Sequence, residues 1–169
     1  MPPRSELPLR LNCEGYFLDQ KGYILAQDSG KGYLLFPGGG IEPGEPAEKA
    51  ILRETIEETG AVVTNLVFLG MLKVRWGPTW AKTEKQRQRY QHYQGDEMHF
   101  FTGTIVYFDT LQSEEDSWGG QKLMPLQEAI TFLERQPHTP EEQAYRAAQL
   151  QYLKSLVKIN GIWDVHKNP

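Results

Sequence analysis

The sequence predicts a mixed α/β domain in which helices flank both faces of a central mixed β-sheet. Strand-like and helix-like segments follow one another without the regular βαβ alternation that an all-parallel sheet requires. With 169 residues, the chain has the size of one domain built around one core. Its 39% hydrophobic and 24% charged residues are ordinary for a globular protein, which excludes a disordered tail, a collagen-like repeat and a coiled-coil rod.

The first part of the chain predicts an arm followed by three short strands. Three prolines fall within the first eleven residues, so we expect residues 1–10 to form an N-terminal arm and residues 11–169 to form a single domain. Glycine-rich turn sequences separate the strand-like stretches, and a glycine-rich loop follows the last of them. We expect strands at 11–18, 23–27 and 33–36, and the loop at 38–40.

The rest of the chain predicts three helices and three further strand regions. Pro46 suits the first turn of a helix, the residues after it are good helix formers, and Gly60 is a natural C-cap. The last helix has Thr139 as N-cap, Pro140 at its first position and Glu142 as capping-box partner. We expect strands at 61–74, 98–108 and 122–124, helices at 46–59, 126–135 and from 140 onward, and a polar loop at 109–121 with a solvated acidic run at 114–116.

Composition also indicates the cellular location and the kinds of partner to expect. The single cysteine, Cys13, excludes an intramolecular disulfide, so the chain does not resemble a small secreted scaffold. No stretch approaches the ~20 apolar residues that a membrane helix needs, and the first twelve residues lack the apolar core of a signal peptide. We therefore expect a cytoplasmic protein without a membrane partner. The net charge of −4 argues against general affinity for nucleic acid.

Three glutamates within the helix at 46–59 carry the first chemical signal. Glu54, Glu57 and Glu58 stand three and four residues apart, so their carboxylates share one helix face although they repel one another. A hard divalent cation such as Mg²⁺ takes such oxygen ligands, and the glycine-rich loop before the helix offers backbone N–H groups to an anion. This combination indicates metal-assisted chemistry on a phosphate ester or anhydride. The alternative is a solvated acidic helix face with Arg53 paired to Glu57.

The complete segment 39–61 is more specific than its glutamates alone. It reads glycine, five residues, glutamate, seven residues, Arg-Glu, two residues, Glu-Glu, one residue, glycine, and it resembles the signature of the Nudix hydrolases. Every polar and glycine position matches, whereas Thr55 and Ala61 are smaller than the aliphatic residues usual there. The resemblance implies the Nudix α/β/α sandwich. The matching residues are Gly39, Glu45, Arg53, Glu54, Glu57, Glu58 and Gly60.

The resemblance implies a set of metal ligands. Members of the family use Mg²⁺ or Mn²⁺, and Glu57 and Glu58 match their main ligands. Glu54 matches a carboxylate that is a ligand or the general base in different members. The family also uses a backbone carbonyl of the glycine run, here Gly38. An acid near the later strand supplies a further ligand or the base in some members, and Glu97 is the candidate.

The resemblance further implies how these glutamates are supported and what they act on. Arg53 matches the arginine that orients them, and Glu45 matches the partner of that arginine. Gly39 and Gly40 are expected to contact the substrate. The implied reaction is hydrolysis of a nucleoside diphosphate linked to another group, with a nucleoside triphosphate, a nucleotide sugar or ADP-ribose, and a dinucleotide polyphosphate all open. The rival is a non-catalytic Nudix-like module that binds nucleotides or regulates a partner.

A basic, aromatic segment at 75–97 lies between two predicted strands. Between residues 75 and 93 it carries five cations against one acid, with interleaved tryptophans and tyrosines. One reading is an insertion beside the active site, with Arg75, Arg87 and Arg89 for substrate phosphates and an aromatic ring for a base. The other is a solvated loop or short helix; RNA binding is a weaker third, so we expect a small nucleotide as the partner. A homodimer also stays open, because the apolar stripe of the last helix, 145–157, suits a core or a dimer surface.

Overall fold

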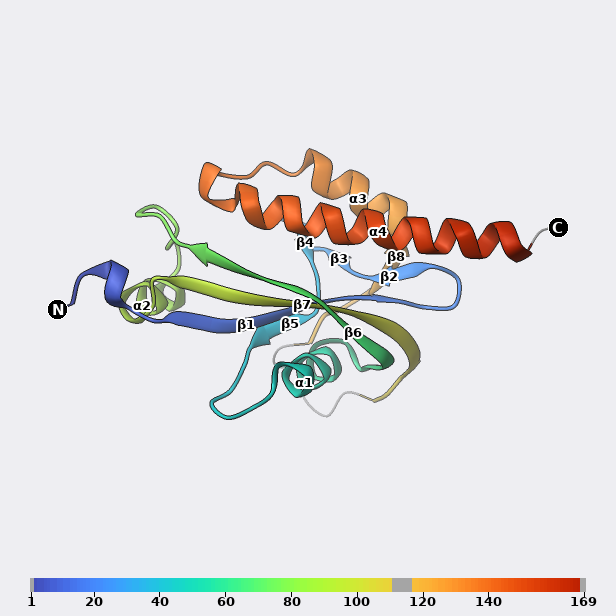
Figure 1. Ribbon diagram of the computed structural model, residues 1–169, viewed down its shortest axis with the longest axis horizontal. Helices are drawn as coiled ribbons and strands as arrows, with labels where there is room; N and C mark the ends of the chain where they lie inside the picture. Colours follow the sequence, from blue (N-terminus) through green and yellow to red (C-terminus); the bar gives the residue numbers. More distant parts are fainter. Residues whose placement is uncertain (1, 111–116, 168–169) are drawn as a thin grey trace.

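The computed structural model describes residues 2–110 and 117–167, so the acidic run predicted at 114–116 lies outside the described residues. It shows three layers (Figure 1), with α1 (Ala47–Thr59) on one face of the sheet and α3 (Leu126–Arg135) and α4 (Gln143–Lys167) on the other. This confirms the predicted α/β/α arrangement. Among the described residues, no helix combines the length and apolar character needed to cross a membrane.

The central sheet is mixed. Its strands lie in the order β6-β7-β1-β2-β8, and β5 also pairs with β1; β3 and β4 form a separate two-stranded ribbon. Only the β1–β7 pair is parallel among the described pairings, and the others are antiparallel. The strands are β1 (Leu9–Leu18), β2 (Tyr23–Leu25), β3 (Gln27–Asp28), β4 (Leu34–Leu35), β5 (Gly38–Gly40), β6 (Ala61–Arg75), β7 (Gly95–Phe108) and β8 (Leu123–Pro125).

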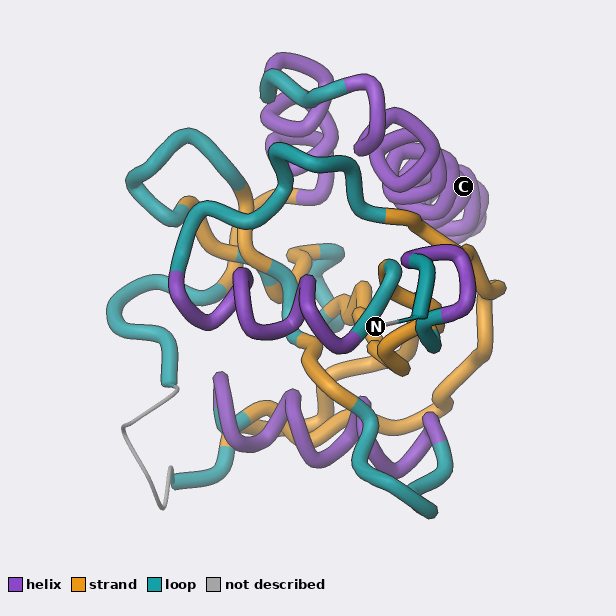
Figure 2. The backbone as a smooth tube through the Cα atoms, turned by 90° about the vertical axis from the view of Figure 1, so that its left-hand side faces the viewer, coloured by secondary structure: helices purple, strands orange, loops and turns teal. Residues whose placement is uncertain are grey.

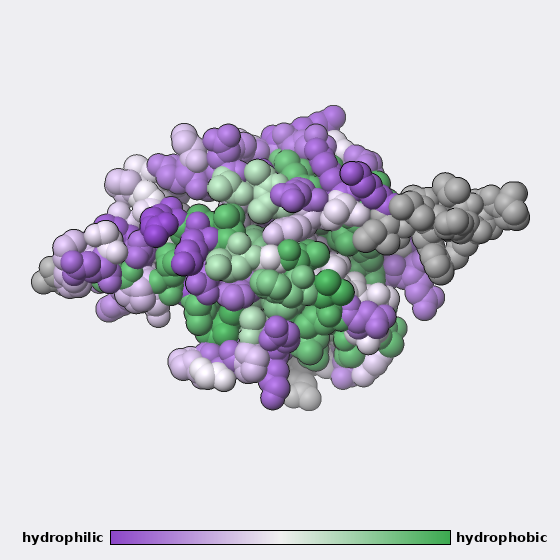
Figure 3. Space-filling view, viewed as in Figure 1, coloured by the Kyte–Doolittle hydropathy of each residue, from purple (hydrophilic) through white to green (hydrophobic). Residues whose placement is uncertain are grey.

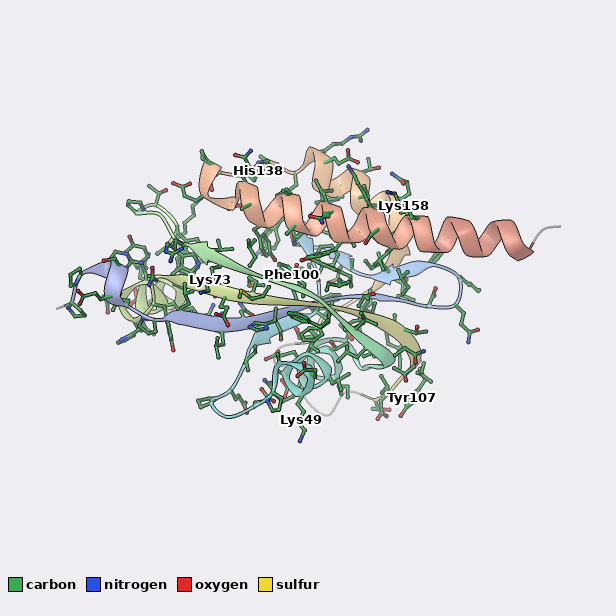
Figure 4. All side chains as sticks on the ribbon, viewed as in Figure 1. Lys49, Lys73, Phe100, Tyr107, His138 and Lys158 are labelled. Atoms are coloured by element: carbon green, nitrogen blue, oxygen red, sulfur yellow. The ribbon has the colours of Figure 1, made fainter. Side chains whose placement is uncertain are left out.

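Two buried clusters fill the spaces between the layers, and strand alternation sorts residues between them. On the α3/α4 side, Tyr16 and Phe100 pack with Leu153 of α4; Phe100, labelled in Figure 4, lies between the sheet and this helix. The apolar stripe of α4 is therefore core. On the α1 side, Phe17 and Phe101 pack with apolar residues of α1. Each residue of β1 and β7 can thus be assigned to one face of the sheet.

Helix α1 follows its sequence signals closely. Gly60 ends it in the left-handed conformation, with φ of 80°, and donates its N–H to the Ile56 carbonyl. Thr55 occupies the position where the resemblance expects a larger aliphatic residue. It is fully buried, and its hydroxyl donates to the Ile51 carbonyl over 2.6 Å, so the small polar side chain is accommodated without an unsatisfied group. Lys49 is exposed and projects away from the sheet (Figure 4).

Several boundaries differ from the predictions. The glycine run is strand β5 rather than a loop, because it pairs with β1 residue by residue. β7 begins at Gly95, so Asp96 and Glu97 lie inside the strand and not before it. The last helix is preceded by a 3₁₀ turn, η2 (Pro140–Glu142), and the Thr139 side chain bonds the Glu142 side chain instead of capping the backbone.

The basic segment is partly helical. α2 (Glu84–His92) starts with a capping box in which Thr83 and Gln86 satisfy each other's backbone N–H groups. At its other end Arg4, from the short turn η1 (Arg4–Glu6), stacks on the Tyr90 ring at 3.3 Å from the ring centroid and donates to the Tyr90 and Tyr93 carbonyls. The N-terminal arm therefore pins α2 against the end of β1, and Figure 1 shows the two side by side.

Apolar side chains also remain exposed along one edge of the sheet. Figure 3 shows them gathered in the middle of the face over β6, which is the edge strand. Val67, Phe68 and Met71 of β6 and Val106 and Tyr107 of β7 are each about half exposed. Three register shifts interrupt the β6–β7 pairing, and such irregularities discourage edge-to-edge aggregation.

Candidate active site

Arg53 is the centre of the glutamate cluster. Its guanidinium forms a fork with Glu45, Nε to Oε2 at 2.8 Å and Nη2 to Oε1 at 3.0 Å. Nη1 reaches Glu54 at 3.1 Å and Glu57 at 3.2 Å, and Nη2 also donates to the Gly40 carbonyl at 3.1 Å. These five hydrogen bonds match the five N–H donors of an arginine. One cation therefore holds three carboxylates and the glycine strand in a fixed arrangement.

The charges in this cluster shift one another's pKa values. The bond from Arg53 is the main reason that the pKa of Glu45 falls from 4.5 to about 2, and the Glu42 backbone contributes further. The same bond raises the pKa of Arg53 above its usual value. Both groups therefore stay ionised at any physiological pH, which suits a supporting ion pair rather than a proton carrier.

Gly38 and Gly39 let the β5 strand approach its neighbours. A Cβ atom on Gly39 would lie 2.6 Å from the Glu54 carboxyl carbon, so the carboxylate sits directly against the glycine backbone. A Cβ atom on Gly38 would lie 2.1 Å from the Cys13 carbonyl oxygen. The Gly38 N–H donates to Glu58 at 2.8 Å. Glycine is thus needed at both positions, at Gly38 for the β1–β5 pairing and at Gly39 for the close approach of the Glu54 carboxylate.

The glutamates have the donor chemistry that a hard cation requires, but they are arranged around Arg53. Glu57 is 54% exposed, whereas Glu54 is 18% exposed. Among residues 2–110 and 117–167, no three acidic, histidine or cysteine side chains converge as a ready-made metal cage. Carboxylates that leave part of the coordination shell to water and substrate phosphates are typical of Mg²⁺ sites. The residues therefore fit a cation whose coordination shell is completed by water and by phosphate oxygens of a substrate.

β7 presents its two neighbouring acids to opposite faces of the sheet. Glu97 and His99 alternate with Met98, which packs toward α4, so they lie on the α1 face. Ring contacts of Phe68 with His99 and Phe101 support this assignment. Glu97 and His99 are linked at 2.9 Å. Glu97 consequently shares a face with the glutamates of α1, which the sequence did not establish.

Asp96 lies on the α3/α4 face, in a cavity of about 610 Å³. This cavity is lined by the ends of β1, β6 and β7, by the loop 76–82 and by the start of α4. Figure 2 shows the loop arching between α2 and the layer of α3 and α4. Gly38 and Gly39 also line the cavity, so it adjoins the strand whose other side carries Glu54. Its volume falls in the range of sites that hold a small organic ligand.

Two tryptophans form one wall of this cavity. The Trp76 and Trp80 rings stack with centroids 3.8 Å apart and planes at 1°. Trp76 is buried, and its Nε1–H donates to Asp96 Oδ2 at 3.1 Å. Burial raises the pKa of Asp96, while the nearby Arg10, Trp76 and Asn12 oppose that rise. The wall is therefore rigid and aromatic, with a carboxylate behind it.

The floor of the cavity toward α4 is a buried hydrogen-bond network. Glu14 accepts hydrogen bonds from the hydroxyls of Tyr16 and Tyr145 and from Gln149 Nε2. Burial raises the pKa of Glu14, and these three donors and the nearby Arg146 oppose the rise. The network fixes α4 to β1 and thereby sets how far α4 stands from the sheet at this cavity.

The structure divides the predicted substrate-binding residues. Arg75 and Arg89 line the cavity, and Arg75 also donates to Gln94 at 3.0 Å. Arg87 is 54% exposed and pairs with Glu84 at 3.1 Å. Gly39 lies at the cavity and Gly40 lies against Arg10. The binding roles of these residues, and the catalytic roles of the glutamates, stay predictions.

Sequence reasoning missed the cavity residues that come from distant elements. The predicted N-terminal arm at 1–10 includes Arg10, and the helix predicted from 140 onward includes Glu141 and Glu142, yet all three residues line the cavity. The predicted strand at 98–108 begins after Asp96 and therefore assigns this residue to neither face of the sheet. Had the strand been extended back to Gly95, its alternation would have separated Asp96 from Glu97. No local sequence pattern indicates that η2 lies beside the other residues of the cavity.

Comparison with known proteins agrees with the fold. The model of the NUDIX domain matches residues 10–148. A solved NUDIX hydrolase from Nitrosomonas europaea superposes with a TM-score of 0.54, covering 90% of each chain at 17% identity, which supports the fold. The Bacillus subtilis (strain 168) protein named "Putative 8-oxo-dGTP diphosphatase YtkD" is 52% identical over 52 residues; the match spans 31% of this chain and 32% of that protein.

The chain therefore belongs to the NUDIX family, whose members are typically dependent on a divalent metal. The arginine of the family signature and the glutamates that follow it are complete on α1.

Proposed function

We propose that this protein hydrolyses a nucleoside triphosphate to the nucleoside monophosphate and pyrophosphate. The observation that carries the proposal is the position of the 610 Å³ cavity, which shares Gly38 and Gly39 with the glutamate cluster. A nucleoside in the cavity directs its phosphates along the glycine strand toward α1. The relative named as an 8-oxo-dGTP diphosphatase supports this substrate class over a nucleotide sugar, ADP-ribose or a dinucleotide polyphosphate.

The cavity walls suit a purine base. The stacked pair Trp76 and Trp80 offers a flat apolar surface, and base–aromatic stacking contributes roughly 1–3 kcal/mol per base in nucleic-acid complexes. Glu141 and Glu142 also line the cavity, and their carboxylate oxygens can accept hydrogen bonds. A base with adjacent N–H donors, as in guanine, satisfies such acceptors.

Glu57 and Glu58 are the proposed ligands of Mg²⁺ or Mn²⁺. Glu54 and the Gly38 carbonyl are the further ligands proposed from the protein. A bound cation of this kind polarises phosphorus and lowers the pKa of water. The support for these residues is their common helix face and the fixed position of Glu54 against Gly39. Arg53, paired with Glu45, holds Glu54 and Glu57 in fixed positions beside the proposed path of the phosphates.

The proton of the attacking water goes to a carboxylate on the α1 face. Glu54 is held next to the glycine strand, and Glu97 lies on the same face of the sheet with His99 as its partner. In the reaction, water oxygen bonds to one phosphorus, the bridging oxygen leaves with the other phosphoryl group, and the carboxylate accepts the proton. Glu54→Gln and Glu97→Gln, compared in one assay, identify which carboxylate acts.

A nucleotide panel tests the proposal. Purified protein is incubated with the common and 8-oxidised purine nucleoside triphosphates, ADP-ribose, a nucleotide sugar and a dinucleotide polyphosphate, with Mg²⁺ or with EDTA. The expected result is pyrophosphate release from a purine nucleoside triphosphate that needs the metal and is lost in Glu57→Gln. Faster hydrolysis of ADP-ribose or a nucleotide sugar contradicts the substrate class. Nucleotide binding without any hydrolysis favours the non-catalytic alternative instead.

The cytoplasmic location and the homodimer stay predictions. The exposed apolar side chains of β6 and β7 support a self-association surface. Sedimentation velocity over a concentration series measures the oligomeric state directly.

A further inference from the structure

Two arginines at the cavity have hydrogen-bond donors that the protein does not use. Within the described residues, the guanidinium groups of Arg10 and Arg89 donate no hydrogen bond, although both side chains are partly buried. Arg53, by contrast, donates five. Both side chains line the cavity, and a guanidinium group with unused donors binds a carboxylate or a phosphate best.

Arg10 stands between the cavity and the glycine strand. It is directly opposite Asp96 in the parallel β1–β7 pair, and its Nη1 lies 3.6 Å from Asp96 Oδ1. This distance allows an ion pair but not a hydrogen bond, and Oδ1 is buried without a hydrogen-bond partner. On the other side, Nη2 would lie 2.9 Å from a Cβ on Gly40, so the guanidinium rests on the backbone of β5.

Arg89 approaches the same point from α2. Burial is the main cause that lowers its pKa, and the charge of Arg10 lowers it further, whereas Asp96 opposes the shift. Two cations therefore share one carboxylate, and that carboxylate already accepts a hydrogen bond from Trp76. α2 cannot move away freely, because Arg4 holds its C-terminal end. The repulsion is built into the fold, and an anion between the two guanidinium groups relieves it.

We propose that Arg10 and Arg89 together bind the phosphate that is directly attached to the nucleoside. The inference rests on the proposed function, since it places that phosphate between the tryptophan wall and the glutamates of α1. Asp96 is the positioning residue: it holds Trp76 by a hydrogen bond and Arg10 by charge, so base and phosphate are located relative to each other. A diphosphate extending beyond this point passes along Gly39 toward Glu54.

Binding measurements in EDTA test the phosphate site without relying on turnover. Titration calorimetry compares guanosine 5′-monophosphate, guanosine and inorganic phosphate on the wild type, Arg10→Gln, Arg89→Gln and Lys85→Gln. Lys85 is an exposed cation on the same helix as Arg89, so its loss controls for net charge. Charge-assisted bonds of this kind predict that the wild type binds the monophosphate about tenfold or more tighter than guanosine. Arg10→Gln and Arg89→Gln should each remove most of that ratio, while Lys85→Gln keeps it.

Asp96→Asn separates phosphate binding from a structural role of the ion pair. Asparagine retains an oxygen that accepts from Trp76 but removes the charge that competes for Arg10. We expect the monophosphate-to-guanosine ratio to stay the same or to rise in Asp96→Asn, and to fall in Arg10→Gln. If the pair were only structural, both variants would lose affinity for monophosphate and guanosine alike, which would overturn the proposal.

The result also distinguishes the two proposals from each other. If the wild type hydrolyses a nucleoside triphosphate but the binding ratio is unchanged in Arg10→Gln and Arg89→Gln, the phosphate site is wrong and the function stands. If the wild type hydrolyses none and binds neither guanosine nor its monophosphate, both are overturned. Binding of inorganic phosphate that is independent of both arginines also contradicts the site.

Discussion

The arginine of the glutamate cluster and the two arginines of the cavity differ in how their guanidinium donors are used. Arg53 is only 26% exposed and is bonded by acceptors that its own sequence neighbourhood supplies. Arg10 and Arg89 come from elements far apart in the chain, and within residues 2–110 and 117–167 the acid that both of them meet is Asp96. A satisfied cation organises the residues around it, whereas unsatisfied cations mark a place for a ligand.

The largest effect is expected in the glutamate cluster, at Glu57, which is one of the proposed metal ligands. Glu57→Gln keeps the size of the side chain and one acceptor for Arg53, and its site is 54% exposed, so the fold should survive. Losing a ligand charge should lower kcat on the order of 10²-fold or more. Steady-state kinetics with Mg²⁺, together with a thermal melt, measure both. Activity near that of the wild type would remove Glu57 from the metal site.

Arg53→Lys tests whether geometry or charge matters in the cluster. Lysine keeps the positive charge but cannot form the fork to Glu45 while also bonding Glu54 and Glu57. Loss of such a supporting residue typically costs about 10- to 100-fold in activity or metal affinity, and we expect a decrease in this range. Equal activity of the lysine variant would show that Arg53 is only a charge partner.

The two glycines of β5 form a matched pair of substitutions. Gly38→Ala places a Cβ against the Cys13 backbone carbonyl, which cannot yield, so it should destabilise the fold by about 1–3 kcal/mol. Gly39→Ala instead meets the Glu54 carboxylate, the movable end of a side chain. It should therefore lower kcat about tenfold with a smaller change in stability. Denaturant unfolding and kinetics on both variants test this reversal; equal losses in both would contradict it.

Arg89→Gln and Arg87→Gln compare a cavity cation with a surface one. Arg89 lines the cavity, whereas Arg87 pairs with Glu84 on the exposed side of α2, where such pairs contribute about 0.3–0.5 kcal/mol. We expect Arg89→Gln to raise KM several-fold more than Arg87→Gln does, and to change kcat less than KM. High salt should reduce this difference in KM only in part, because the charge of Arg89 is partly shielded from the solvent. The same KM for both would identify the whole segment as a solvated surface.

The smallest effect concerns acid stability. The folded-state pKa of Glu45 is lowered to about 2 from an ordinary value of 4.5, mainly by Arg53. Its contribution to stability is therefore complete above about pH 4.5 and is lost as the pH falls toward 2. Glu45→Gln should flatten this part of the stability–pH curve and leave the curve above pH 5 parallel to that of the wild type. Unfolding measured at several acidic pH values checks it.

Residues close in sequence were the ones predicted well. The helix at 126–135 matches α3, the helix at 46–59 differs from α1 by one residue, and the strand at 11–18 lies within β1. Segments whose structure depends on a distant partner were predicted less well. The glycine run became a strand only because β1 pairs with it, and β7 extends back to Gly95 because it pairs there with Arg75 and Leu9.

The sequence by itself determined the family, the glutamate face and its arginine, because these residues lie within one helix and the loop before it, where spacing alone sets their geometry. The tertiary structure alone decided which acid of β7 joins which face, and it assembled the cavity from Arg10, Trp76, Asp96 and η2. The physical reason is the range of the contacts. Helical periodicity is readable along the chain, whereas contacts across the sheet and between layers depend on strand register and packing, which no local pattern specifies.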